Sequence, residues 1–84
     1  MITVYTRPDC QPCKATKRKL SQLGAAYAVI DVTKDPEALD LIRDLGYLQA
    51  PVIVVRDGGE LIHWGGYAPD KLEWAALSLE THEP

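Results

Sequence analysis

The sequence predicts a small α/β domain in which a four-stranded mixed sheet carries three helices, in the order βαβαββα. Four short apolar runs are typical of strands, and they occupy residues 2–5, 27–32, 52–55 and 61–64. Stretches with the apolar spacing of a helix follow the first, second and fourth runs. A hairpin turn, Asp57-Gly58-Gly59, joins the last two. With 84 residues the chain has room for one domain, residues 1–84.

The first half reads as two strands that each lead into a helix. The first helix is predicted from about Gln11 to Leu23, with Gly24 ending it. The second begins at the pair Asp35-Pro36, an N-cap followed by a proline in the first turn. Its apolar stripe consists of Ala38, Leu41, Ile42 and Leu45, and Gly46 ends it. This order predicts two parallel strands joined by a right-handed crossover.

The second half predicts a hairpin and a last helix. Residues 52–55 (Val-Ile-Val-Val) form an unbroken β-branched run, as expected of a central strand covered on both faces. Residues 61–64 return antiparallel, and Pro69 opens the helix. One stripe of that helix contains Leu72, Ala75, Ala76 and Leu79. Residues 80–84 are expected to form a disordered tail.

Composition excludes several classes of partner. The formal net charge is -3, from 9 basic and 12 acidic residues, so we expect no nucleic-acid partner. No apolar run is long enough to span a membrane, and residues 1–15 do not read as a signal peptide. We therefore expect a cytoplasmic protein with no membrane partner. Nothing in the sequence demands a dimer, and a monomer is expected.

Two cysteines, Cys10 and Cys13, lie where the first strand gives way to the first helix. On a helix, residues three apart share a face, so the two sulfurs can form a disulfide. Cys10 falls at the helix N-terminus, where unpaired N–H groups and the helix dipole favour a thiolate. The pair therefore predicts a redox site with Cys10 as nucleophile and Cys13 as resolving cysteine.

Two other interpretations of the cysteine pair remain open. It could supply half of a zinc site, but four ligands are usual, and the only other soft candidates are His63 and His82. We expect no metal. The pair could also be a structural disulfide, although so short a loop removes little entropy from the unfolded chain.

The element order, with CxxC after the first strand, resembles the minimal thioredoxin fold that glutaredoxins share. Pro51 directly precedes the predicted central strand, where a trans proline would fit a ladder poorly. In that fold a cis-proline loop stands at this place and faces the cysteines. We therefore predict that the Ala50-Pro51 peptide bond is cis.

Three segments resemble the NrdH-redoxins, glutaredoxin-like electron donors of class Ib ribonucleotide reductase. The first consists of residues 5–7 and 13–17 on either side of the cysteine motif. The others are residues 45–52 (Leu-Gly-Tyr-Leu-Gln-Ala-Pro-Val) and residues 64–70 (Trp-Gly-Gly-Tyr-Ala-Pro-Asp). The chain departs from that family's pattern at Gln11-Pro12 between the cysteines. It also has Gly65 and Tyr67 where the family has serine and phenylalanine. Because the residues between the cysteines tune the reduction potential of the pair, the sequence leaves this potential open.

The resemblance implies a dithiol-disulfide oxidoreductase that donates electrons to a protein disulfide of ribonucleotide reductase. Thioredoxin reductase would restore the dithiol with electrons from NADPH, and no cofactor would be bound. The alternatives are a glutathione-dependent glutaredoxin and a carrier of an iron–sulfur cluster that Cys10 would bridge between two chains. The aspartate pair that anchors glutathione in glutaredoxins is missing, since residues 66–69 read Gly-Tyr-Ala-Pro. A non-catalytic binding module is the third hypothesis.

Beside the two cysteines, the sequence and the resemblance point to residues that would contact the partner. Trp64 and Tyr67 could form an apolar rim, although Trp64 could equally belong to the core. Arg7 would face the substrate, unless it is a solvated charge. The full predicted set is Arg7, Gln11, Pro12, Ala50, Pro51, Trp64, Gly65, Gly66 and Tyr67.

Overall fold

The computed structural model describes residues 1–81, and it confirms the predicted order of elements. The strands are β1 (Ile2–Thr6), β2 (Tyr27–Asp31), β3 (Val52–Asp57) and β4 (Glu60–Gly65). The helices are α1 (Gln11–Gln22), α2 (Pro36–Asp44) and α3 (Pro69–Thr81). Together they form the predicted thioredoxin-like fold.

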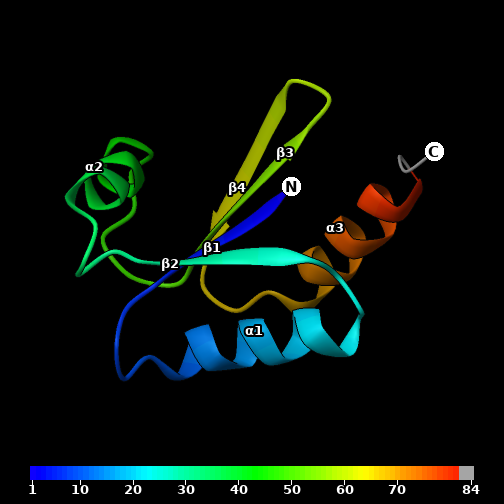
Figure 1. Cartoon of the computed structure of the whole chain (residues 1–84), viewed down its shortest axis with the longest axis horizontal. Coiled ribbons are helices and arrows are strands. Elements are labelled where there is room, and N and C mark those ends of the chain that lie inside the picture. The colour runs from blue at the N-terminus through cyan, green and yellow to red at the C-terminus, as the bar shows by residue number, and fades with distance from the viewer. Residues whose placement is uncertain (82–84) are drawn as a thin grey trace.

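The four strands form one mixed sheet in the order β2-β1-β3-β4 (Figure 1). The pair β1 and β2 is parallel, whereas β3 runs antiparallel to both β1 and β4. Tyr5, near the end of β1, pairs with Val52 at the start of β3. This register brings the segment that leaves β1 beside the segment that enters β3. The cysteines and Pro51 therefore meet at the same end of the sheet.

Alternating side chains of the sheet face two separate apolar cores. On one face, residues of α1 and α3 pack on the sheet, forming the cluster Ile2, Val4, Leu20, Ile53, Val55, Trp64, Leu72 and Ala75. On the other face α2 forms a cluster with the sheet that contains Tyr5, Val32, Ala38, Ile42, Val52 and Val54. In Figure 1 α2 stands on one side of the strands, and α1 and α3 stand on the other. The central strand β3 is buried on both faces, as predicted.

Turn and cap residues act as the sequence predicts. Gly58 and Gly59 both have positive φ, 58° and 92°, which a two-residue hairpin turn of type I′ requires. At the start of α2, the Ala38 N–H donates to Oδ1 of Asp35 over 3.1 Å. Between the helices of one face, Lys19 of α1 and Glu73 of α3 form an ion pair of 3.2 Å.

The C-terminal end differs in part from the prediction. Helix α3 continues through Thr81, although the sequence predicted a tail from residue 80. A helix gains one backbone hydrogen bond for each residue added, so it extends beyond the last apolar residue that packs. The rest of the predicted tail, residues 82–84, and the side chain of Leu79 lie outside the described part. Within residues 1–81, no helix has the length and apolar character that crossing a membrane requires.

Candidate active site

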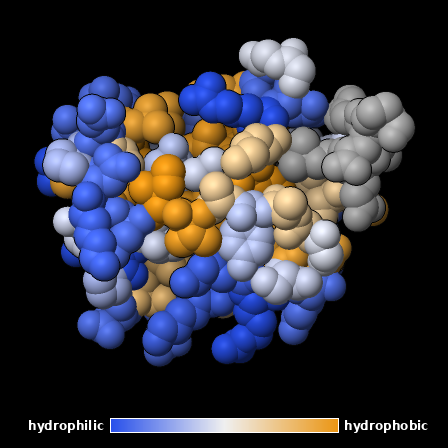
Figure 2. Space-filling model, in the orientation of Figure 1, coloured by the Kyte–Doolittle hydropathy of each residue, from blue (hydrophilic) through white to orange (hydrophobic). Residues whose placement is uncertain are grey.

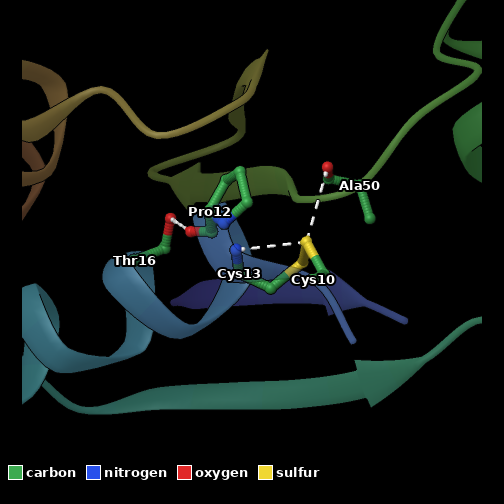
Figure 3. Close-up of a disulfide and its surroundings, with 5 residues drawn as sticks. All are labelled: Cys10, Pro12, Cys13, Thr16 and Ala50. Atoms are coloured by element: carbon green, nitrogen blue, oxygen red, sulfur yellow. Dashed lines mark hydrogen bonds between the residues drawn. A yellow bond between two sulfur atoms is a disulfide. The ribbon is translucent and has the colours of Figure 1, made fainter. Parts of the chain in front are cut away.

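Cys10 is the N-cap residue of α1, which is the place that the spacing of the cysteines predicts. Its Sγ accepts a hydrogen bond of 3.2 Å from the backbone N–H of Cys13 (Figure 3). From the second turn of α1, the Thr16 hydroxyl donates to the carbonyl oxygen of Pro12 in the first turn over 2.8 Å. Pro12 fits there because the N–H that proline lacks would have no partner within the helix. One of the unpaired donors of the helix start is thus aimed at the Cys10 sulfur.

The two cysteines form a disulfide, and their Cα atoms are 5.2 Å apart, a usual separation for a bridged pair. Cys10 is 9% exposed and Cys13 is 2% exposed. A partner sulfur therefore reaches Cys10 more easily than Cys13. This difference supports the predicted roles of nucleophile and resolving residue.

The Ala50-Pro51 peptide bond is cis, which confirms the prediction. The carbonyl oxygen of Ala50 lies 3.7 Å from the Cys10 sulfur, as Figure 3 shows. The side chain of Pro51 is buried, and its carbonyl oxygen accepts a hydrogen bond of 2.9 Å from Gly66 N–H. Pro51 thus contributes to the site through its backbone, and it connects the cysteine side of the site with the segment that follows β4.

An open groove of about 590 Å³ lies beside the disulfide. Its lining brings together five residues that the sequence predicted, namely Pro12, Ala50, Gly65, Gly66 and Tyr67. It also contains Tyr47 and Leu48, which the sequence analysis did not single out. Leu48 is 88% exposed, although its side chain is fully apolar. The available sequence signal for this wall of the groove was its position, since Tyr47 and Leu48 lie three and four residues before the predicted cis-proline.

A smaller cavity of about 210 Å³ lies on the other side of residues 47–50. Arg7 and Arg43 line it, together with Thr33 and the apolar side chains of Val32, Leu39 and Ile42. Arg7 therefore lies near the site but in a different hollow from Tyr67. Arg43 was not predicted, because its contribution depends on how α2 packs beside the loop after β1.

The structure corrects one predicted partner residue. Trp64 is 4% exposed and belongs to the core between the sheet and helices α1 and α3. Alternation along β4 explains this, because the side chain of Trp64 points to the face opposite to that of its neighbour His63. Trp64 therefore forms no part of an exposed rim, whereas Tyr67 is 44% exposed. Gln11 is exposed as well, but it lines neither hollow.

The described part of the structure contains no cluster of side chains that would support a zinc site. Among residues 1–81, no three His, Cys, Asp or Glu side chains gather where they could hold a metal ion. Nδ1 of His63 is instead hydrogen-bonded to the hydroxyl of Tyr47, at 2.6 Å. His82, the other candidate ligand, lies outside the described residues.

Besides Arg7 and Arg43, charged side chains near the site lie on α1 and at the end of β2. Lys14 and Arg18 are exposed on α1, whose outer side is strongly hydrophilic in Figure 2. On the side of the smaller cavity, the Thr33 hydroxyl and N–H both donate to Oδ1 of Asp31, over 2.6 and 2.9 Å. These two bonds hold the pKa of Asp31 below its usual value of 3.8, and the bond from the Thr33 hydroxyl has the larger effect.

Comparison with known proteins agrees with this geometry. The Glutaredoxin family model matches residues 2–62. The glutaredoxin-like protein NrdH of Escherichia coli is 39% identical over 71 residues, which are 84% of this chain and 83% of the relative. The gene 56 protein of Mycobacterium phage L5 is 38% identical over 73 residues, which cover 86% of this chain and 68% of that protein.

Structural comparison leads to the same group. The structure of NrdH-redoxin from Escherichia coli matches with a TM-score of 0.77 and 35% identity, and the match covers 99% of this chain and 95% of that one. The chain has the CxxC pair as a disulfide, in the position that the fold predicts. It is a thiol-disulfide oxidoreductase of the glutaredoxin family, and within that family it belongs with the NrdH-like redoxins.

Proposed function

We propose that this protein donates electrons to a protein disulfide, that of a class Ib ribonucleotide reductase, and that thioredoxin reductase restores its dithiol with electrons from NADPH. This function would be carried out in the cytoplasm and needs no bound cofactor. It is supported by the similarity to NrdH and by the reported thioredoxin-like activity profile of the Escherichia coli NrdH-redoxin.

The reaction proceeds in two exchange steps. The Cys10 thiolate attacks one sulfur of the partner disulfide, so a mixed disulfide forms and one partner thiolate leaves. The Cys13 thiolate then attacks the Cys10 sulfur, which forms the Cys10–Cys13 disulfide and releases the second partner thiolate. Two electrons pass to the partner, and two protons complete its thiols. The reductase returns two electrons to the pair.

One observation carries the proposal, namely the hydrogen bond from Cys13 N–H to the Cys10 sulfur at the start of α1. In the reduced protein, this donor and the positive end of the helix dipole stabilise negative charge on that sulfur. They act on the sulfur that is also the more exposed of the two. No acid-base residue is needed, because the leaving group is itself a thiolate.

The groove beside Cys10 favours a protein substrate over glutathione. Its lining consists of uncharged residues, and Tyr67 and Leu48 present apolar surface there. Where glutaredoxins carry the aspartate pair, this chain has Ala68 and Pro69. Asp70 is exposed in the first turn of α3 and does not line the groove. The ammonium group of glutathione therefore has no carboxylate partner in this lining.

A coupled assay of NADPH oxidation tests the electron source. The protein and a protein disulfide are supplied once with thioredoxin reductase and once with glutathione plus glutathione reductase. We expect turnover in the assay with thioredoxin reductase and none in the assay with glutathione. Turnover with glutathione alone would contradict the proposal and assign the chain to the glutathione-dependent glutaredoxins.

Two variants test the roles of the cysteines. Cys10→Ser is expected to lose disulfide reduction, because the attacking sulfur is gone. Cys13→Ser is expected to accumulate a mixed disulfide with the partner, visible on a non-reducing gel, because nothing resolves it. Full turnover by the Cys10→Ser protein would overturn the assignment.

A further inference from the structure

We propose that Tyr47 is a positioning residue of the substrate groove, and that its hydrogen bond to His63 holds the segment 46–50 in the shape that a protein substrate requires. The inference deepens the proposed function and rests on it. It concerns two side chains that the exchange chemistry does not use.

The contact between the two residues crosses from a loop to the sheet. The Tyr47 hydroxyl and Nδ1 of His63 are 2.6 Å apart, and the two rings pack edge to face with centroids 5.5 Å apart. Tyr47 follows α2, whereas His63 lies in β4 opposite Val54 of β3. Because β4 is fixed by the sheet, its histidine gives the loop an anchor that does not depend on neighbouring residues in the chain.

Gly65 leaves the space that the Tyr47 ring occupies. A Cβ at position 65 would lie 3.1 and 3.2 Å from Cδ1 and Cε1 of Tyr47, closer than side chains normally pack. The NrdH-redoxin pattern has serine at this position, and this chain has glycine. The chain thus has all three parts of this contact. They are the ring of Tyr47, its hydrogen-bond partner His63, and a glycine at position 65 that leaves space for the ring.

The segment that Tyr47 anchors has few other restraints. Its start is held by Tyr47 N–H, which donates to the carbonyl oxygen of Ile42 over 2.9 Å. Within residues 1–81, Leu48 and Gln49 make no hydrogen bond, and both are exposed. The segment ends at Ala50, whose carbonyl oxygen lies against the Cys10 sulfur. The hydrogen bond of the Tyr47 side chain to His63 thus restrains the segment 46–50, which extends to the Cys10 sulfur.

Loss of this support should affect binding more than chemistry. Tyr47 lines both hollows beside the segment, and Leu48 and Ala50 line them with it. A protein lying over Cys10 contacts these residues, so movement of the segment weakens its binding. The donor to the Cys10 sulfur comes from α1, which the Tyr47–His63 bond does not touch. The rate from the bound complex should therefore change little.

The test is the reduction of insulin disulfides with dithiothreitol as electron source, after subtraction of the uncatalysed rate. Tyr47→Phe keeps the ring and removes the hydroxyl, and His63→Ala removes the partner. Each is expected to raise KM about threefold to tenfold, as loss of one hydrogen bond predicts, with kcat within about twofold of the wild type. The double variant should be no worse than either single one, because both remove the same bond.

Two further variants separate positioning from a general effect on the fold. Tyr27→Phe removes a hydroxyl that bonds Ser21 and the carbonyl of Lys17, away from the groove, and should leave KM unchanged. His63→Asn places a polar atom near the position of Nδ1 and should recover most of the wild-type KM.

The outcomes separate this inference from the proposed function. An unchanged KM in Tyr47→Phe and His63→Ala would overturn the inference, and so would additive effects in the double variant. A fall in kcat with no rise in KM would also overturn it. A wild-type protein without any turnover of insulin would overturn the proposed function, and this inference with it.

Discussion

The two hollows on either side of residues 47–50 differ in shape and in charge, although four residues line both. The groove is open, measures about 590 Å³ and has an uncharged lining that includes Pro12, Gly66 and Tyr67. The cavity measures about 210 Å³ and has Arg7 and Arg43 in its lining. Within residues 1–81, neither arginine forms an ion pair.

Because of this difference, we expect the two hollows to contribute differently to the recognition of a partner protein. Apolar surface that is removed from water contributes affinity, and large side chains at the centre of an interface contribute most. Exposed charges mainly affect the association rate and the choice of partner, and salt screens them. We therefore expect the groove to determine how tightly a partner binds, and the arginines to determine which partners approach quickly. Two variants test this comparison, and a third tests the effect of a charge beside the cavity on stability.

The largest effect is expected from Leu48→Ser, at an apolar side chain that lines the groove and also borders the cavity. The leucine is 88% exposed in the free protein, so the change should cost little stability. Loss of its burial against a partner should lower kcat/KM for a protein disulfide about tenfold, mostly through KM. The measurement is steady-state reduction of insulin. Leu77→Ser on α3, at a leucine that is 63% exposed, is the matched control, and an equal loss there would contradict a specific role of the groove.

A smaller effect is expected in the cavity, from the double variant Arg7→Ala and Arg43→Ala. For a disulfide peptide with acidic flanking residues, kcat/KM should fall about threefold at low salt, because the steering charges are lost. The difference should shrink in about 0.5 M salt, where the Debye length is only a few ångströms. Arg56→Ala removes an exposed arginine that lines neither hollow and serves as control. A loss that does not depend on salt would show that the arginines act by packing.

The smallest effect is expected from Asp31→Asn, next to the cavity, where Asp31 accepts hydrogen bonds from the lining residue Thr33. The folded-state pKa of Asp31 lies below its unfolded value, so its charge stabilises the fold above the usual pKa of 3.8. That contribution is lost as pH falls through the folded-state pKa. The wild type should therefore exceed the variant in free energy of unfolding at pH 7, and the gap should close in acid. Denaturant unfolding at both pH values measures it, and a constant gap would refute the charge effect.

Most of the fold follows from short-range patterns in the chain. The Gly58-Gly59 turn, the cap at Asp35 and the β-branched run of β3 each have a local physical cause, and the structure confirms each one. The roles proposed for Cys10 and Cys13 come from the same kind of reasoning, since a helix start determines which sulfur has unpaired N–H groups beside it.

The lining of the site could not be predicted in this way, because it depends on which segments the sheet brings together. The sequence left Trp64 undecided between rim and core, and only the packing of β4 on α1 and α3 places it in the core. Tyr47 and Arg43 were missed because they reach the site through the register of β1 with β3 and the placement of α2.

The sequence by itself thus determined the order of the elements, the cis-proline and the reactive cysteine pair. Their causes lie within a few residues of chain, or in motifs that a family shares. Only the tertiary structure decided that Tyr47 bonds His63, that Gly65 makes room for its ring, and that two unlike hollows flank the loop beside Cys10. These features join residues that are distant in the chain, and no local pattern encodes their contact.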